Sequence, residues 1–451
     1  MGAEPEGTCR VKASHNLAAV AVSFDEDNLV PNAGLVAPAS LAARLGIAGL
    51  VDRRVRLRKD APGAASSGAK ALTVLGSMLA GGDSIDDVDV LRAGAAPELF
   101  DDTRAPSTIG TWLRAFRWCN LRELDAVCRE TLAAAWTAGL GPADRSAPLT
   151  IDVDSTVCQA YGTKKQGCKF GYTKVRGFHP LLATVASTGE VAHVRMRGGN
   201  AASAKGARSF VTETIGRVRE AGATGELTVR ADSAFYSRAM LWACRKAGAK
   251  FSVTVRMNRS VRAAIDAIPD DAWTPIPYWL DGGADVAEVA YSAFSGRHRM
   301  DVRLIVRRVR PSPGSQLALD VVFDYHALVT DRDGATLTLE ADHRAHAQVE
   351  LVIRDLKDGP LAHLPSGKFA ANGAWLALTT LAHNLGRWTL TAAGPEFDAA
   401  TVGSLRRKVI AMPARLVSSG RRLRLRAPTN WPWRHAVERA LAVVAAIPAP
   451  G

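Results

Sequence analysis

The sequence predicts a mixed α/β protein in which a β-rich segment interrupts a central mixed sheet. Three observations lead to this class. Residues 1–145 mostly follow helical spacing after an irregular stretch at 1–35, whereas apolar and polar residues alternate in strand fashion from residue 149. Strand and helix patterns then alternate as far as residue 255. Residues 256–335 combine prolines, aromatic residues and strand patterns, and helical spacing resumes after them.

The first 145 residues are predicted to be mostly α-helical. Apolar residues recur at helical spacing in 37–57, in 69–80 and from Pro106 onwards. No helix-turn-helix signature is present. The region is therefore a candidate DNA-binding unit, and a packed helical domain without that role fits the same pattern.

Residues 146–255 and 336–400 are predicted to form the central fold in two parts. Strand patterns in the first part cover 149–154, 178–186, 191–196, 227–231 and 251–255, and helical patterns cover 204–221 and 238–247. Three strands in a meander followed by alternating helix and strand are the order of an RNase H-like core. The second part begins with an amphipathic helix, marked by Ala345, Val349, Val352, Ile353 and Leu356.

Residues 256–335 are predicted to be a β-rich insertion into that core. Strand patterns cover 286–291, 300–306 and 319–329, and the Pro-Gly pair at 313–314 suits a hairpin or a loop. Trp273 and Trp279 lie in the same segment.

The charge of the chain is high and unevenly placed. The formal net charge is +13, and residues 401–451 hold ten Arg or Lys against one acid. Within this basic C-terminal segment, leucines separate some of the arginines, which include Arg421, Arg422, Arg424 and Arg426. A segment of this density attracts polyanions. Nucleic acid is the leading predicted partner; an anionic membrane surface and simple solvation are the alternatives, and the apolar content argues against simple solvation.

The remaining composition is that of a reduced, soluble protein of two to four domains. None of the six cysteines lies in a Cys-x-x-Cys pair, which argues against a zinc ribbon. The N-terminus has no signal pattern. The apolar stretch 369–390 contains Asn372, His383, Asn384 and Arg387, so it is predicted to be a buried helix and not a membrane span.

Three widely separated acids carry the functional prediction. Asp154 and Asp232 each end an apolar strand pattern and precede a serine, and Glu350 lies on the amphipathic helix. Cleaving or joining a phosphodiester requires a deprotonated nucleophile and neutralisation of charge, which two Mg²⁺ or Mn²⁺ ions can provide. Such ions prefer carboxylate oxygens. On a basic chain, the three acids indicate metal-dependent chemistry on a polynucleotide.

Each acid also has a structural alternative. Asp154 and Asp232 suit the cap of a turn or helix. Glu350 suits an i,i+4 ion pair with Arg354. Asp152 shares the strand face of Asp154, so it is a rival first metal ligand, a support for that ligand, or simply a buried acid.

These motifs resemble those of bacterial insertion-sequence transposases of the DDE class, in the branch with a β-rich insertion between the second Asp and the Glu. The similar stretches are Ile-Asp-Val-Asp-Ser-Thr at 151–156, Val-Arg-Ala-Asp-Ser-Ala-Phe at 229–235, Arg-Gly-Gly-Asn at 197–200, and Glu350 with Lys357 seven residues later. They cover about half of the chain directly, and the order of the domains extends the similarity to nearly all of it.

The resemblance implies that Asp154, Asp232 and Glu350 hold Mg²⁺, or Mn²⁺, at the catalytic centre. It implies cleavage at the element ends and transfer of the 3′-OH ends into target DNA. The implied partner is double-stranded DNA, both transposon ends and target, with a homodimer holding two ends together. The expected location is the bacterial cytoplasm, in association with the nucleoid.

The resemblance also implies DNA contacts around the third acid. Lys357 is implied as a phosphate contact, and Arg354 shares the polar face of its helix. The family often has Tyr seven and Arg four residues before the Glu, where this chain has His343 and His346. Arg344 lies two residues earlier than the expected Arg and is a further candidate DNA contact. The way in which an element end is held therefore departs from the family pattern.

Two further points stay open at the level of sequence. Trp273 and Trp279 are candidates for stacking on a flipped base, with packing inside the β-rich insertion as the alternative. An RNase H-like nuclease without strand transfer and a domesticated DNA-binding protein without catalysis are the alternative functions.

Overall fold

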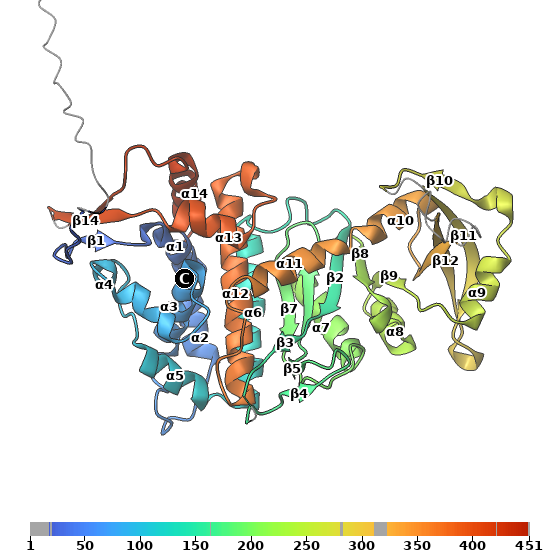
Figure 1. The fold of residues 1–451 in the computed structure, drawn as a ribbon, viewed down its shortest axis with the longest axis horizontal. Helices are drawn as coiled ribbons and strands as arrows, with labels where there is room; N and C mark the ends of the chain where they lie inside the picture. The colour runs from blue at the N-terminus through green and yellow to red at the C-terminus, as the bar shows by residue number, and fades with distance from the viewer. Residues whose placement is uncertain are drawn as a thin grey trace, which may run out of the picture.

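The computed structural model describes residues 18, 20–162, 164–279, 283–310, 323–420 and 422–449. A helical body, a central sheet with its covering helices, and a β-rich extension follow one another in a row (Figure 1). Arg421, the Pro-Gly pair at 313–314 and the first part of the predicted strand 319–329 lie outside the described residues.

The central sheet has nine strands in the order β10-β11-β12-β13-β9-β8-β2-β6-β7. Its core strands are β2 (Leu149–Ser155), β6 (Leu181–Val185), β7 (Val191–Arg195), β8 (Leu227–Ala231) and β9 (Ala249–Thr254). β2, β8 and β9 are parallel to one another, whereas β6 is antiparallel to both β2 and β7. This order and these directions confirm the predicted RNase H-like core.

Helices cross between the core strands as the pattern predicts. α7 (Ala207–Glu220) joins β7 to β8, and α8 (Arg238–Lys246) joins β8 to β9, with the Ser237 side chain accepting a hydrogen bond from Met240 N at its start. The predicted strand 178–186 is broken before Leu181, because Pro180 has no N–H to donate to a ladder. Residues before that break belong to a small separate sheet of β3 (Cys158–Gln159), β5 (Arg176–Phe178) and β4 (Lys169–Phe170).

The β-rich insertion extends the core sheet. β10 (Thr274–Ile276), β11 (Ala284–Ala293), β12 (Met300–Val309) and β13 (Asp324–Thr330) form antiparallel ladders. β13 also pairs with β9, with Leu328 opposite Thr254, so hydrogen bonds run without interruption from the core into the extension. α9 (Arg259–Asp266) packs against β11, and the short 3₁₀ turns Asp270–Ala272 and Gly296–His298 lie on the connecting segments.

The helical body is built from both ends of the chain. Its helices are α1 (Val36–Arg44), α2 (Ile47–Arg54), α3 (Ser67–Ala80), α4 (Ala96–Leu99), α5 (Pro106–Ala115), α6 (Trp118–Thr137), α12 (Phe369–Ala393), α13 (Val402–Leu405) and α14 (Arg434–Ala446), with short turns at Ala33–Leu35, Asp86–Arg92, Pro395–Phe397 and Arg406–Ile410. The predicted helix 37–57 is two helices, because Gly46 takes a left-handed φ of 65° between them.

The C-terminal segment is folded against the N-terminal one. β14 (Ala414–Ser419) pairs with β1 (Leu29–Val30) on one side and with β15 (Arg422–Arg426) on the other. α14 packs on α1 and on α12, as Figure 1 shows where the red and blue ends of the chain meet. The charged residues of this segment therefore sit on a defined structure.

α12 is the central helix of the body. Almost all of its side chains are buried, including Trp375 and Trp388, in agreement with the prediction from sequence. Among the described helices, no single one is long and apolar enough to cross a membrane, although the bent pair Ala33–Arg44 and Ile47–Arg54, with 50° between them, passes that test together.

A buried carboxylate joins the helical body to the sheet. Glu190, in the turn between β6 and β7, accepts hydrogen bonds from Trp136 Nε1 of α6 (2.7 Å) and from Trp388 Nε1 of α12 (2.6 Å). Burial raises the pKa of Glu190 to about 7. Beside it, the Asn384 amide bonds both backbone groups of Val191. The helical body thus provides a fixed support for one end of the sheet.

Candidate active site

The register of two core strands places two of the predicted acids side by side. Val153 of β2 lies opposite Ala231 of the parallel strand β8. Asp154 and Asp232 are the next residues of the two strands, so their side chains leave the carboxyl edge of the sheet at the same level. This edge is where α/β proteins commonly place their functional groups.

The third acid reaches the same edge on a helix. α11 (Ala347–Lys357) packs on β2 through a buried apolar face, and it follows α10 (Thr336–Arg344) after a break of two residues. Glu350 lies in the first turn of α11 and is exposed. Among the described residues, Glu350 forms no ion pair with Arg354, so the i,i+4 ion pair that the sequence offered as the alternative is absent there.

The three acids influence one another electrostatically. Burial is the main reason why the pKa of Asp154 is raised from its ordinary 3.8 to about 6. The charges of Asp232 and Glu350 also raise this pKa, which requires that both lie close to Asp154. The N–H of Ser155, which donates to Asp154 Oδ1 at 2.6 Å, and the nearby His346 act in the opposite direction.

The group carries uncompensated negative charge. Within the described parts of the chain, none of Asp154, Asp232 and Glu350 forms an ion pair with Lys, Arg or His. Asp232 does cap a turn, because its Oδ1 accepts from Ala234 N at 3.0 Å, but that bond uses one oxygen only. Converging carboxylates without a basic partner are the donor set that hard divalent cations take. The residues present therefore fit a divalent metal.

Asp152 is engaged elsewhere. It is fully buried, and its Oδ2 accepts from Arg230 Nη2 at 2.8 Å in a two-point ion pair that also uses Oδ1. His346 Nδ1 lies 2.9 Å from the same Oδ1. Both oxygens of Asp152 are therefore occupied, and the geometry favours Asp154 as the first ligand.

The Asp152–Arg230 pair also fixes the helix that carries Glu350. Arg230 of β8 donates to the carbonyl of Asp342 and, at 3.1 Å, to that of Ala345, where α10 ends. The cation thereby satisfies carbonyls at a helix C-terminus, where positive charge is favoured. The sequence contained one signal for this role, which is a charged residue, Arg230, inside a strand pattern of mostly apolar residues at Leu227–Ala231.

His343 anchors α10 to the neighbouring strand. Its two ring nitrogens lie 2.8 Å from Ser252 Oγ and 2.8 Å from Thr254 Oγ1 of β9. Burial lowers the pKa of His343 to about 3, so the ring is neutral. The two histidines that depart from the family pattern, His343 and His346, are thus both bonded to the sheet.

The predicted DNA contacts are spread over several places. Lys357 lies near the Cys158 thiol. Burial raises the pKa of this thiol, and the positive charge of Lys357 opposes that rise. Arg354 is exposed on α11. Arg344 is bonded to Glu340 at 3.0 Å and covers the ring of Tyr278 at 5.9 Å, so it lies toward the extension.

Of the arginines in the basic C-terminal segment, three stand on one strand. Arg422, Arg424 and Arg426 alternate along β15 and are exposed.

The two tryptophans differ from each other. Trp273 is packed under Arg308, whose guanidinium lies 4.3 Å from the ring, whereas Trp279 is 79% exposed.

A second group of potential ligands lies away from this edge. Asp125, His193 and Glu213 place one ligand atom each within 4.8 Å of one another, a closer spacing than that of the three acids above. Arg217 pairs with Asp125 and Arg195 pairs with Glu213, so the charges already balance. Burial lowers the pKa of His193 well below its usual range, and this group is best described as a link between α6, β7 and α7.

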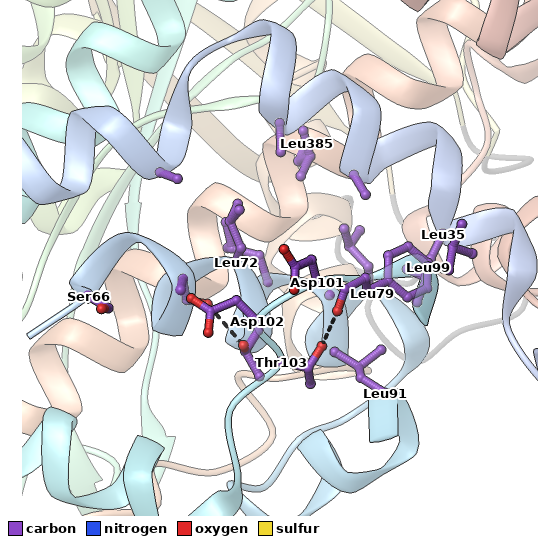
Figure 2. A pocket seen from close by; sticks show the side chains of 18 of the residues that line it. Leu35, Ser66, Leu72, Leu79, Leu91, Leu99, Asp101, Asp102, Thr103 and Leu385 are labelled. Carbon is purple, nitrogen blue, oxygen red and sulfur yellow. Dashed lines mark hydrogen bonds between the residues drawn. The ribbon is translucent and has the colours of Figure 1, made fainter. Parts of the chain in front are cut away.

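An apolar hollow in the helical body is also remote from the acids. A cavity of about 460 Å³ in the helical body is lined by leucines from several helices, with Asp101 and Asp102 at its rim (Figure 2). Thr103 closes one side by donating to Phe100 O at 2.8 Å. None of the predicted site residues lines it.

An RNase H-like sheet with carboxylates at its carboxyl edge is typical of enzymes that act on polynucleotides. The family model described as transposase DDE domain group 1 matches residues 12–449. The chain belongs to this family, which confirms the predicted resemblance, and it is an enzyme of phosphodiester hydrolysis and transesterification. No curated protein matches the chain. A solved piggyBac transposase synaptic complex with hairpin DNA is similar at a TM-score of 0.38 and 12% identity, over 93% of this chain and 81% of that chain.

Proposed function

We propose that this transposase cleaves DNA at insertion-sequence ends and joins the 3′-OH ends to target DNA at the edge of β2 and β8. The observation that carries the proposal is the placement of Asp154 and Asp232 at one edge of the sheet, with Glu350 on the helix that packs on β2, none of them with a basic partner. Such a group is costly to a fold unless a bound cation compensates it.

The proposed ligands are these three carboxylates, and the proposed ions are Mg²⁺, with Mn²⁺ as a substitute. These residues would hold a pair of ions whose chemistry would be to activate the attacking oxygen and to stabilise the leaving one. Asp154 and Asp232 are held by paired strands, so they provide the fixed part of the site. Glu350 is exposed on α11, and the Asp152–Arg230 pair holds that helix in position. Lys357 and Arg354 are proposed to contact the DNA phosphates next to the cut.

Double-stranded DNA is the proposed partner for both the element ends and the target. The net charge of +13 supports a polyanion, and Arg422, Arg424 and Arg426 offer an exposed row of cations on one strand. Arg344 and the exposed Trp279 are proposed to meet the DNA from the extension, with Trp279 available for base stacking. A homodimer is proposed because two ends must be held at once. The proposed location is the nucleoid in the bacterial cytoplasm.

The test uses a linear donor that carries the DNA flanking this reading frame, a supercoiled target plasmid and Mg²⁺. The expected result is a joined product that requires Mg²⁺ and is lost in Asp154→Asn, Asp232→Asn and Glu350→Gln. Asp358→Asn, an exposed acid at the end of the same helix, is the matched control and retains activity.

Other results would change the proposal in defined ways. Nicks or fragments without joined products would indicate a nuclease. DNA binding without any cleavage, together with an unchanged cellular role for the three variants, would indicate a domesticated binding protein. Full activity of the variants would refute the site.

A further inference from the structure

The small sheet of β3, β5 and β4 occupies the connection between β2 and β6, so it begins directly after the first proposed metal ligand. Ser155, next to Asp154, lies 3.1 Å from Ser203 through their hydroxyls. Phe178 forms a bridge with Gly198 of the loop that follows β7. Figure 1 shows this sheet beside the lower end of α12. The small sheet is therefore a folded unit next to the acidic edge, and the proposed reaction assigns it no role.

The sheet is held firmly in place. Lys165 Nζ donates to Leu364 O at 2.6 Å, and Gln166 N donates to Gly367 O at 2.9 Å, which ties the sheet to the connection between α11 and α12. The backbone of Gly199 passes so close to the sheet that a Cβ on Gly199 would lie 2.1 Å from Gly177 O. A side chain exposed on this sheet is thus presented from a fixed support.

The charge of the sheet has one sign. Residues 158–178 contain five Lys or Arg and no Asp or Glu. Lys164, Lys169 and Lys174 are exposed, and none of them forms an ion pair within the described residues. A segment of this composition complements a polyanion.

Three aromatic side chains are exposed on the same segment. Tyr161 is 74%, Phe170 66% and Tyr172 75% exposed. Because these rings are mostly exposed, they contribute little to the stability of the fold, and several exposed aromatic residues on one segment indicate an interaction site. Tyr172 is supported on one side by the buried His179, with ring centroids 5.6 Å apart.

We propose that this sheet binds unpaired nucleotides of the DNA at the cleavage edge, by stacking bases on Tyr161, Phe170 and Tyr172 while the lysines contact phosphates. The faces of bases inside a duplex are covered by their neighbours, so exposed rings recognise single strands in particular. The proposal deepens the proposed function and rests on it for the identity of the strand, which is the strand opened at the cut.

The experiment measures metal-free binding by fluorescence anisotropy in EDTA, with a labelled 20-nucleotide single strand and the duplex of the same sequence. The variant replaces Tyr161, Phe170 and Tyr172 by Ala together. It is expected to bind the single strand at least 10-fold more weakly, because each stacked base contributes about 1–3 kcal/mol, and to bind the duplex within about 2-fold of wild type. With this variant, a single strand labelled with 2-aminopurine is expected to lose the fluorescence quenching that the wild-type protein produces.

Two controls separate stacking from other causes. Tyr161→Phe, Phe170→Tyr and Tyr172→Phe, combined in one protein, keep the rings and are expected to keep the affinity. Phe24→Ala removes an exposed ring elsewhere and is expected to have no effect. Thermal melting checks folding, and single substitutions replace the triple variant if its melting temperature falls.

Several results would overturn the proposal. These are equal losses for single strand and duplex, no loss for either, or a changed oligomeric state by light scattering with unchanged binding, which would make the sheet a protein interface. Mg²⁺-dependent cleavage by the wild type is measured separately. Absent cleavage with retained single-strand binding refutes the proposed function alone, and the reverse result refutes only this inference.

Discussion

Replacing Asp154 by Asn should stabilise the metal-free protein, although the same change should abolish its activity. The substitution removes the charge and preserves the shape, and the Asn oxygen can still accept from Ser155 N. The carboxyl has a pKa of about 6 in the folded chain and 3.8 ordinarily, so the charged form is disfavoured by folding.

The size of the effect follows from that difference. Two pKa units correspond to about 3 kcal/mol, and contact of the half-buried carboxylate with solvent reduces this to roughly 2 kcal/mol. The unfolded chain loses its proton first, near pH 4, and the folded chain only near pH 6. Wild-type stability therefore falls as the pH rises between these values, and the advantage of the variant is complete above them.

The assay is differential scanning calorimetry in EDTA at pH 7.5 and pH 4. At pH 7.5 the variant is expected to melt about 2 °C higher, given the unfolding entropy of a chain of this length. At pH 4 the difference should shrink to about a quarter. Adding Mg²⁺ at ten times its Kd should stabilise the wild type by about 1.4 kcal/mol and leave the variant unchanged.

The matched control lies two residues away on the same strand face. Asp152→Asn should have the opposite sign, because it leaves Arg230 buried without its partner, at a cost of about 3–5 kcal/mol. A lower melting temperature for Asp154→Asn in EDTA at pH 7.5 would refute the reasoning, and so would a difference that is the same at pH 4 and pH 7.5.

Three further results are expected. Arg230→Gln should lower stability by about 3–5 kcal/mol and reduce Mg²⁺-dependent cleavage, because α11 loses its anchor; unchanged melting and cleavage would contradict the anchoring role. Glu190→Gln offers one acceptor oxygen for two indole N–H groups and should cost about 1–3 kcal/mol, measured by thermal melting, where an unshifted curve would count against the link. Arg422, Arg424 and Arg426 changed together to Gln should reduce the slope of log K against log salt by about 2 to 3 for duplex DNA, and an unchanged slope would place the DNA elsewhere.

The parts of the fold that could be predicted are those marked by a local pattern of apolar and polar residues. β2 and β8 were recognisable because apolar residues alternate or run together and end at an acid followed by a serine. The break at Gly46 and the pairing of β1 with β14 were not, since the first depends on one left-handed residue and the second joins distant segments. β3, β4 and β5 are two or three residues long and leave no period to detect.

The candidate site also has a part that local sequence predicts and a part that depends on contacts between distant residues. Asp154 and Asp152 have the same side-chain direction, so period two could not choose between them. The choice depends on Arg230, which lies 78 positions away in sequence and meets Asp152 only through the β2–β8 register. Burial around Asp154, and the approach of Glu350, are likewise products of packing that no local pattern contains.

The pairing of the two chain ends has a consequence for synthesis. The helices between residues 33 and 137 leave the ribosome well before β14 and α14, which complete the same helical body. Until then β1 has no partner and the apolar faces of α1 and α12 lack their cover. The helical body can therefore be completed only after α14 has been translated. A reading frame that stops before residue 414 would yield a core sheet with its predicted catalytic acids and an unfinished support, so loss of the last strands should inactivate such a copy by misfolding while all three acids remain in place.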